Sequence, residues 1–357
     1  MGLFSCYNAF AAGGKNGEAL HFIDSGLLRF SGWWAKAPTE PWLSAPFRPC
    51  VGLFREIAAA GVSGGVHAGK EIFSNKGTKQ MNQFQYRLIA LDIDGTLLNS
   101  RKEVAPETLA AIREAARAGI SVVFCTGRSV GELEEFYTLL PEIRWAVYSS
   151  GGGLYDIAAR KAFSLHGIPR AQAEEIMALA RTKDVMPQLI LADRGVIQAS
   201  HFAKLDRYHM GAFRALYEKS MTLAPDIFEF FDACREEILK INLYHADPAE
   251  RVRTREQLAH LPMERVYSEK SSLESTPLGV DKGAGLLRLC EALGIRKEET
   301  AAVGDGENDL AMLRMAGLGI AMGNASETVK KAADRVAADL DHGGCAEAIR
   351  MVLGIQP

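Results

Sequence analysis

Short, mainly apolar segments alternate with longer amphipathic segments along most of the chain after residue 86. Four such runs are Leu88–Leu91, Ile120–Cys125, Trp145–Tyr148 and Thr300–Val303. Continuous apolar runs of this length predict strands buried on both faces, as in a parallel sheet covered by helices. Pro106 opens one predicted connecting helix, since proline is favoured at the first helical position, and residues 130–140 form another. The alternation therefore predicts an α/β fold with a Rossmann-like parallel sheet.

The pattern changes between residues 165 and 276. Expected here are a helix over 171–182, strands over 187–191 and 196–199, a helix over 204–219, a strand over 238–244, a helix after Pro248, and strands near 265–267 and 272–275. This mixture predicts an α+β cap module inserted into the sheet domain. We therefore expect a core of residues 81–164 and 277–357 and a cap of residues 165–276. The cap histidines His201, His209 and His245 share no metal-binding spacing, so we expect them to be solvated or to cap helices.

Residues 1–80 differ from the rest of the chain. Proline and glycine recur, three of the four tryptophans occur here, and only Val51–Ala60 has the pattern of a short helix. Three interpretations remain open: a disordered or loosely attached leader, sequence upstream of a biological start at Met81, or a small functional appendage. A start at Met81 would place the first strand a few residues from the N-terminus.

Composition disfavours several classes of function. The hydrophobic fraction of 48% and the charged fraction of 24% are typical of globular proteins. A formal net charge of −3 gives no general attraction to nucleic acid or to anionic membranes. No apolar run reaches the roughly 18 residues of a membrane span. The six cysteines form no CxxC pair, which argues against thiolate metal sites and disulfides and favours a cytoplasmic location.

Two carboxylates follow the first strand, at Asp92 and Asp94, before a Gly95-Thr96 turn. Side chains two residues apart in an extended segment point to the same side. Ligands of open α/β sheets bind at the carboxyl ends of the strands, where this pair would lie. Close carboxylates repel each other, and a divalent cation such as Mg²⁺ would remove that penalty. An ordinary acidic turn is the alternative interpretation of this pair on its own.

Three further polar groups follow or adjoin predicted strands. Thr126-Gly127 stands between a strand and a helix, where a hydroxyl and backbone N–H groups could bind an anion or simply cap the helix. Lys282 stands at a helix start, which opposes the helix dipole unless its side chain serves another group such as a phosphate. The acidic cluster after the fourth strand comprises Asp305, Asn308 and Asp309. Gly323-Asn324 forms a further predicted turn.

Taken together, these motifs resemble the haloacid dehalogenase superfamily of phosphohydrolases. The motifs are Asp92-Ile93-Asp94-Gly95-Thr96, Thr126-Gly127-Arg128, Lys282 and Gly304-Asp305-Gly306-Glu307-Asn308-Asp309. The sequences GVDKGAGLLRL, GDGENDLAML, AMGNA and DHGGCAEAI are most similar to the Cof-type branch, subfamily IIB, which includes sugar phosphatases. That branch carries a large α+β cap, of the type called C2B, after the third strand of its core.

The resemblance implies a role for each motif. Asp92 would be the nucleophile that forms an aspartyl-phosphate, and Asp94 would be the general acid and base. The Asp92 side chain, the Asp94 backbone carbonyl and Asp305 would hold Mg²⁺, supported by Asn308 and Asp309. Thr126, the Gly127 backbone and Lys282 would hold the phosphoryl oxygens. The expected activity is Mg²⁺-dependent hydrolysis of a small phosphorylated metabolite, with no nucleic-acid or membrane partner.

One departure from the family pattern and two alternatives to this activity remain. Ser150-Gly151 stands where family members usually have Asn-Gly, which makes substrate preference hard to carry over. A phosphomutase of the same branch would share the motifs, and a non-catalytic binding protein could retain the fold. Possible substrate contacts in the cap are Arg207, His209, Lys240 and Asn242, and the sequence does not rank them. The oligomeric state cannot be inferred from the sequence.

Overall fold

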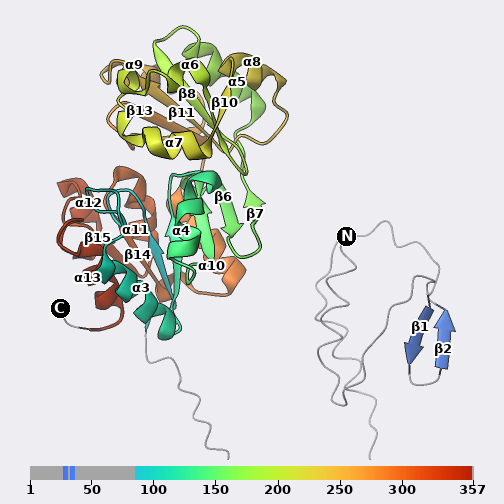
Figure 1. Ribbon diagram of the computed structural model, residues 1–357, viewed down its shortest axis with the longest axis vertical. Coiled ribbons are helices and arrows are strands. Elements are labelled where there is room, and N and C mark those ends of the chain that lie inside the picture. Colours follow the sequence, from blue (N-terminus) through green and yellow to red (C-terminus); the bar gives the residue numbers. More distant parts are fainter. Residues whose placement is uncertain (1–26, 31–32, 37–84, 356–357) are drawn as a thin grey trace, which may run out of the picture. The chain divides into compact units, whose positions relative to one another are not determined.

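The computed structural model describes residues 27–30, 33–36 and 85–355, and the chain divides into two compact units, Met1–Gly77 and Thr78–Pro357. In the first unit, strands β1 (Leu27–Phe30) and β2 (Trp33–Lys36) pair antiparallel (Figure 1). We did not predict this hairpin, because the polar and apolar positions around it show little periodicity. The helix expected at Val51–Ala60 and the proposed start at Met81 lie outside the described residues.

The second unit contains an eight-stranded sheet in the order β16-β15-β14-β3-β4-β5-β6-β7 (Figure 1). The strands from β16 to β5 are parallel, and β6 and β7 add an antiparallel extension after β5. The bounds are β3 (Leu88–Leu91), β4 (Ser121–Cys125), β5 (Trp145–Tyr148), β6 (Gly153–Asp156), β7 (Lys161–Leu165), β14 (Thr300–Gly304), β15 (Leu318–Ala321) and β16 (Arg335–Val336). The predicted Rossmann-like parallel sheet is thereby confirmed.

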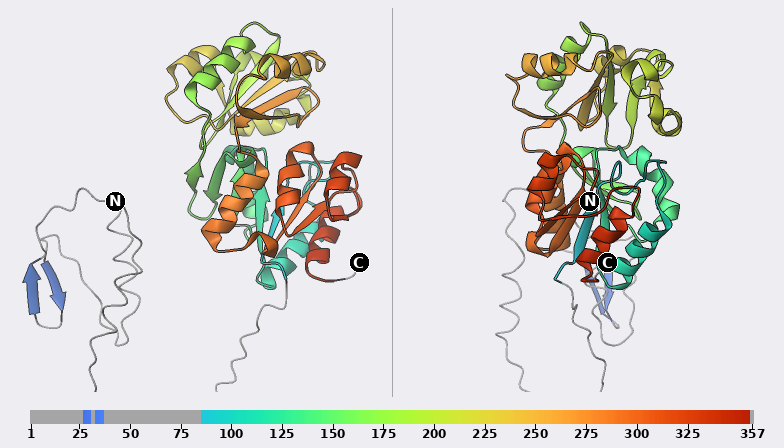
Figure 2. Two further views of the ribbon diagram at one scale, coloured as in Figure 1. Left: turned by 180° about the vertical axis from the view of Figure 1, so that it is seen from behind. Right: turned by 90° about the vertical axis from the view of Figure 1, so that its left-hand side faces the viewer.

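Helices cover both faces of this sheet (Figure 2). They are α3 (Pro106–Arg117), α4 (Glu134–Leu139), α10 (Lys282–Leu293), α11 (Leu310–Met315), α12 (Glu327–Ala332) and α13 (Gly344–Val352). Alternate residues of β3 point into different cores: Ile89 packs with α3 and α13, and Ala90 packs with α10 and α11. Burial on both faces explains why the strands are continuously apolar in sequence.

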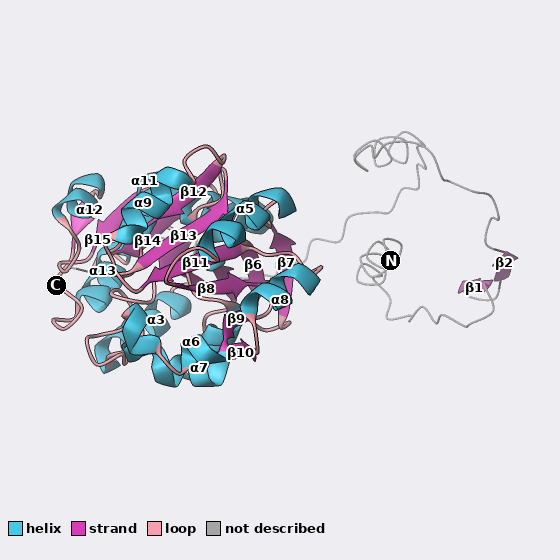
Figure 3. Cartoon of the chain, turned by 90° about the horizontal axis from the view of Figure 1, so that it is seen from above, coloured by secondary structure: helices cyan, strands magenta, loops and turns pink. Residues whose placement is uncertain are grey.

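A second, six-stranded sheet is formed entirely by the chain between β7 and α10. Its order is β10-β9-β8-β11-β13-β12, and all neighbours are antiparallel except β10 and β9. The strands are β8 (Val185–Ile190), β9 (Gly195–Gln198), β10 (Met221–Ala224), β11 (Lys240–His245), β12 (Met263–Val266) and β13 (Ser272–Pro277). The helices are α5 (Arg170–Ala180), α6 (Ala199–Phe202), α7 (Arg214–Ser220), α8 (Ile227–Ala233) and α9 (Glu250–Gln257) (Figure 3).

The two faces of this second sheet differ in chemistry. Helices α5 and α8 pack on one face through an apolar cluster that includes Ile241 and Leu243 of β11. The opposite face of β11 presents Lys240, Asn242 and Tyr244, which line a cavity shared with the parallel-sheet domain. We refer to the part of the chain that carries this second sheet as the cap.

Three expectations for the cap were wrong in detail. The helix expected over 204–219 is broken into 3₁₀ turns at Leu205–Tyr208 and Gly211–Phe213, followed by α7. The break follows from His209, whose φ of +59° is left-handed and ends a helix. Strand β10 and helix α8 were missed, and both are short. His245 is buried rather than solvated, with Nδ1 3.0 Å from the Ser271 carbonyl and Nε2 2.8 Å from the Thr254 hydroxyl.

Two further findings concern membranes and thiols. Among residues 27–30, 33–36 and 85–355, no helix is long and apolar enough to cross a membrane. Cys125, Cys234, Cys290 and Cys345 are all free thiols, and Cys6 and Cys50 lie outside the described residues.

Candidate active site

Asp92 follows β3, which lies between β14 and β4 in the parallel sheet and is fully buried. The backbone N–H of Asp92 donates to the Val303 carbonyl of β14 at 3.0 Å, which fixes the exit of the chain from the sheet. Gly95 then adopts a φ of +86°, and a Cβ there would collide with the Asp305 carboxylate. Glycine is therefore required at this turn. The Asp92 carboxylate is left at the carboxyl edge of the sheet, only 6% exposed.

Lys282 bridges two buried carboxylates from the first turn of α10. Its Nζ donates to Asp92 Oδ1 and to Asp309 Oδ1, both at 2.6 Å, and the side chain is 1% exposed. Burial alone would favour the neutral amine, but these two carboxylates hold the pKa of Lys282 above its ordinary value. The helix dipole disfavours a lysine at the N-terminus of α10, and the bonds to Asp92 and Asp309 explain why Lys282 is found there.

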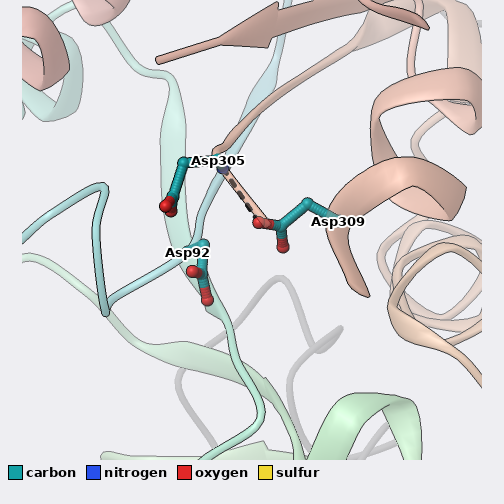
Figure 4. A group of neighbouring side chains, drawn as sticks. All are labelled: Asp92, Asp305 and Asp309. Atoms are coloured by element: carbon teal, nitrogen blue, oxygen red, sulfur yellow. Dashed lines mark hydrogen bonds between the residues drawn. The ribbon is translucent and has the colours of Figure 1, made fainter. Parts of the chain in front are cut away.

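Asp92, Asp305 and Asp309 form one acidic cluster, with one oxygen of each within 4.8 Å of the others (Figure 4). Asp309 is fully buried, and its Oδ2 accepts from the backbone N–H groups of Asp305 and Gly306, both at 2.9 Å. Burial and the nearby Asp309 raise the pKa of Asp92 well above its usual range and that of Asp305 to about 6. Carboxylates destabilised in this way are the groups that a divalent cation would stabilise.

The donor set fits a hard divalent cation. Both oxygens of Asp309 already accept hydrogen bonds, so Asp309 orders the loop and Lys282. Asp305 is held by the Thr96 hydroxyl at 2.9 Å and by Asn324 Nδ2 at 3.2 Å, and Asn324 also donates to the Gly95 carbonyl. Asp92 Oδ2 has no hydrogen-bond partner among the described residues. The carboxylates of Asp92 and Asp305 are of the type that suits Mg²⁺, which takes few protein ligands and keeps several waters, and binding through one oxygen of Asp92 would leave the other free.

Asp94 lies in a different electrostatic environment from Asp92. Arg128 donates to it through Nε at 2.8 Å and Nη2 at 3.0 Å, and Lys102 Nζ donates at 3.0 Å. Although burial opposes ionisation, these cations lower the pKa of Asp94 to about 2. Arg128 also donates to the Glu132 carbonyl and to Glu135, so it is held firmly. No role was predicted for Arg128 or Lys102 from the sequence, although Arg128 belongs to the Thr126-Gly127-Arg128 motif.

Thr126 and Gly127 occupy the loop after β4, beside Asp92. The Thr126 hydroxyl is buried and accepts from the Arg128 backbone N–H at 3.1 Å. This bond is a turn contact within the loop and does not cap the helix that follows, because that helix begins at Val130 and has Ser129 as its N-cap. A Cβ on Gly127 would lie 3.3 Å from both Lys240 Nζ and Ser150 Oγ, so glycine allows the cap to approach closely here.

A cavity of about 120 Å³ brings most of the expected site residues together. Its core-side lining includes Asp92, Asp94, Thr126, Gly127, Arg128, Asp305 and Asn308. Lys282 and Asp309 do not line the cavity. Lys282 lies behind it, bonded to Asp92 of the lining, and Asp309 is bonded to Lys282. Of the four cap residues considered, Lys240 and Asn242 line the cavity, whereas Arg207 pairs with Asp184 and His209 contacts the Ala246 carbonyl.

Lys240 and Glu274 form a buried ion pair that joins the cap to the core. Lys240 Nζ donates to the Gly127 carbonyl at 2.6 Å, to Glu274 Oε2 at 3.2 Å and to Ser150 Oγ at 3.4 Å. The Ser150 hydroxyl donates to Glu274 at 2.9 Å. Ser150, which departs from the family pattern, thus belongs to the contact between cap and core. Glu274 was missed, although its place beside apolar Leu273 marked a strand with one polar face.

Comparisons with known proteins identify the family. A sequence model of the haloacid dehalogenase-like hydrolase family matches residues 89–349 of this chain. Phosphatase YwpJ of Bacillus subtilis is 29% identical over 300 residues, covering 75% of this chain and 100% of the relative. The 5-amino-6-(5-phospho-D-ribitylamino)uracil phosphatase YcsE of the same species is 30% identical over 274 residues, covering 76% and 97%. Pyridoxal phosphate phosphatase YbhA of Escherichia coli is 28% identical over 265 residues, covering 71% and 93%.

Solved structures agree in fold. A haloacid dehalogenase-like hydrolase from Bacillus subtilis matches with a TM-score of 0.66 at 28% identity, covering 74% of this chain and 99% of that one. A subclass IIB sugar phosphatase matches with a TM-score of 0.66 at 23% identity, covering 76% and 100%, which supports the fold alone. On the sequence match and on this architecture, the chain belongs to the haloacid dehalogenase-like hydrolase family.

Proposed function

We propose that this protein hydrolyses a small phosphate monoester with the help of Mg²⁺, through a phosphorylated Asp92. Two of the reported relatives, YcsE and YbhA, are named as phosphatases of small phosphorylated compounds. The chain retains an acidic cluster, a buried lysine and a threonine-glycine loop around one cavity. These are the parts that phosphoryl transfer requires, since its catalysis depends mainly on positioning and charge neutralisation.

The state of the Asp92 carboxylate is the observation that carries the proposal. Oδ1 is fixed by Lys282, while Oδ2 has no partner in the described part of the chain and the residue lines the cavity. A carboxylate held by one oxygen and open at the other is oriented as a nucleophile. Lys282 is also bonded to Asp309, so the nucleophile is anchored to a second buried group. A protein that only bound phosphate would gain nothing from this arrangement.

The reaction would proceed in two displacements. In the first, Asp92 Oδ2 bonds to phosphorus, the bond from phosphorus to the leaving oxygen breaks, and Asp94 gives that oxygen a proton. In the second, Asp94 takes a proton from a water whose oxygen attacks the same phosphorus, which releases phosphate and restores Asp92. The Thr126 hydroxyl and the loop N–H groups would hold the phosphoryl oxygens during both steps.

The surroundings of Asp94 suit the second step directly. With a pKa of about 2, Asp94 is a carboxylate at neutral pH and can accept a proton from water. The first step requires a protonated Asp94, and hence weaker contacts to Arg128 and Lys102. A phosphate dianion beside these cations would compete for them and raise the pKa of Asp94. Arg128 thus adjusts Asp94 between its two roles.

Asp92, Asp305 and the Asp94 backbone carbonyl would hold Mg²⁺, with Asn308 close by. When bound, the ion supplies positive charge that neutralises the phosphoryl oxygens and the carboxylates around them. The raised pKa values of Asp92 and Asp305 are consistent with this assignment, because burial without a cation disfavours their charged forms.

Replacement of the nucleophile tests the proposal. Asp92→Asn keeps the shape of the side chain but removes the charge that attacks, so it should abolish hydrolysis of p-nitrophenyl phosphate in the presence of Mg²⁺. Asp232→Asn, at an exposed carboxylate paired with Arg181, is the matched control and should retain wild-type activity. Circular dichroism must show both variants folded. Appreciable turnover by the Asp92 variant, or undiminished wild-type turnover in EDTA, would contradict the proposal.

Neither alternative activity is favoured by a particular contact. A mutase must also accommodate a second phosphoryl group, and every cation that lines the cavity is already paired with a carboxylate. Adding a sugar bisphosphate and assaying for an isomerised monophosphate separates a mutase from a phosphatase. A non-catalytic binder would give no turnover with any ester in the presence of Mg²⁺.

A further inference from the structure

The cap wall of the cavity is a polar sheet face that is buried. Along β11 the residues alternate, so that Ile241 and Leu243 enter the apolar cluster while Lys240, Asn242 and Tyr244 face the cavity. Asn242 is paired across the sheet with Gln188 of β8 and with Glu274 of β13. A polar sheet face is normally solvated, but these side chains are at most 5% exposed. Burial of polar groups is costly unless they are hydrogen-bonded.

Most of these groups satisfy one another. Asn242 Nδ2 donates to Gln188 Oε1 at 2.7 Å, and the Tyr244 hydroxyl donates to the same oxygen at 3.0 Å. The Tyr217 hydroxyl lies 3.2 Å from that of Tyr244. The exception is Asn242 Oδ1, which is buried and has no partner in the described part of the chain. A neutral hydrogen-bond acceptor without a partner in the protein is available to a hydrogen-bond donor on a bound molecule.

The charges of the cavity exclude one class of leaving group. The cations in its lining are Arg128 and Lys240, and the hydrogen bonds described above engage both of them with carboxylates and carbonyls. The lining also carries Glu132, Glu269 and Glu274 besides the aspartates of the core. A second anionic group on the substrate would therefore meet carboxylates and find no free cation. Like charges placed together in a desolvated site are strongly unfavourable.

We propose that Asn242, with Gln188 and Tyr244, forms a subsite for an uncharged leaving group that donates a hydrogen bond from a hydroxyl or N–H to Asn242 Oδ1. This assignment rests on the phosphatase activity proposed above and narrows its substrate class. The substrates are monophosphates of neutral polyhydroxylated or N–H-bearing compounds. Bisphosphates and phosphorylated carboxylic acids are rejected.

Wild-type selectivity gives the first test and needs no variant. Glucose 6-phosphate and 6-phosphogluconate share their phosphate end, and the second carries a carboxylate at the far end. The proposal predicts that kcat/KM for glucose 6-phosphate exceeds that for 6-phosphogluconate by about tenfold or more, because the second carboxylate meets the carboxylates of the lining and finds no free cation there. Equal values, or a preference for the carboxylate, would overturn the proposal. Failure to hydrolyse p-nitrophenyl phosphate as well would instead refute the phosphatase activity itself.

The second test is a variant of the acceptor. In Asn242→Leu, the ratio of kcat/KM for glucose 6-phosphate to that for the donor-free ester propyl phosphate should fall about tenfold, the effect of one lost hydrogen bond to substrate. Ser275→Ala is the matched control, since Ser275 Oγ is likewise buried without a partner, outside the cavity lining. That control should keep the wild-type ratio. An unchanged ratio in folded Asn242→Leu would overturn the subsite, as would an equal fall in Ser275→Ala.

Discussion

Asp92 and Asp94 are two residues apart in sequence, and their surroundings push their pKa values in opposite directions. Burial and Asp309 raise the pKa of Asp92, whereas Arg128 and Lys102 lower that of Asp94 to about 2. Pairs of titratable groups whose environments separate their pKa values are typical of sites in which each group has its own role. The two carboxylates are therefore not equivalent, as the roles proposed for them require: Asp92 as the nucleophile and Asp94 as the group that carries the proton.

Removal of the lysine that bridges two carboxylates should be strongly destabilising. Lys282→Met leaves Asp92 and Asp309 buried without their shared cation, at a cost of about 3 to 5 kcal/mol in the free energy of unfolding. Urea denaturation in EDTA measures this cost without compensation by a metal. Lys297→Met, at a lysine for which no carboxylate contact is found in the described residues, is the control and should change stability little. A Lys282→Met variant as stable as the wild type would refute the bridging role.

At the scale of elements, the contact between cap and core depends on a few buried polar groups. β11 and β13 supply Lys240 and Glu274, which meet the loop after β4 and the turn after β5. That turn, Ser149–Gly151, has positive φ values at Ser149 and Ser150 as well as at Gly151. Left-handed serines are strained, so the surrounding contacts must hold this turn in place. A cavity of about 120 Å³ behind this contact is small for a sugar phosphate, which favours cap movement during binding.

The buried ion pair of the cap gives a prediction about coupling. Lys240→Met should destabilise the protein by about 3 kcal/mol or more, because Glu274 is left charged and unpaired in the interior. The double variant with Glu274→Leu should recover part of that loss, because both charges are then absent. Urea denaturation of the wild type, the two single variants and the double variant gives the four free energies of unfolding that a double-mutant cycle requires. Additive effects would show that the two side chains do not interact.

Because His245 is buried, we expect the stability of the protein to depend on pH. Burial lowers its pKa below the ordinary value of 6.5, so the native state resists protonation. Below about pH 6.5 the unfolded chain binds a proton that the native chain does not, and the free energy of unfolding falls as the pH falls. His245→Gln should therefore lose less stability than the wild type between pH 7.5 and pH 5.5 in urea denaturation. An unaltered pH dependence in folded His245→Gln would contradict the assignment.

For the molecule as a whole, the features that could be predicted from the sequence were those marked by a strong pattern of apolar and polar residues. Continuous apolar strands indicated the parallel sheet, and oxygen-bearing residues after them indicated the site. Contacts between distant segments could not be predicted in the same way. Nothing local to Arg128 shows that it grips Asp94, and nothing local to Ser150 shows that it meets Glu274 across the cap. The left-handed backbone conformation of His209 depends on its tertiary contacts, so the prediction of one continuous helix over 204–219 was wrong.

The division of the chain into two units gives a prediction about truncation. Thr78–Pro357 forms one compact unit that contains the eight-stranded sheet, the six-stranded sheet and the whole cavity. A chain that begins at Met81 should therefore fold and retain the kcat of the full-length protein with p-nitrophenyl phosphate. Its urea midpoint should also match. A truncated chain that aggregates, or that loses activity while folded, would show that the preceding residues contribute to the site or to its stability.

Direct detection of the phosphorylated residue tests the central claim most sharply. Asp94→Asn removes the base of the second step, so a reactive ester such as p-nitrophenyl phosphate should phosphorylate this variant faster than water releases the phosphate. After an acid quench, peptide mass spectrometry should find the mass of one phosphoryl group on Asp92. Asp92→Asn/Asp94→Asn should show none. A phosphoryl group on another residue would contradict the proposed role of Asp92 as the nucleophile. An Asp94→Asn variant that turns over at the wild-type rate with no adduct on Asp92 would contradict it as well.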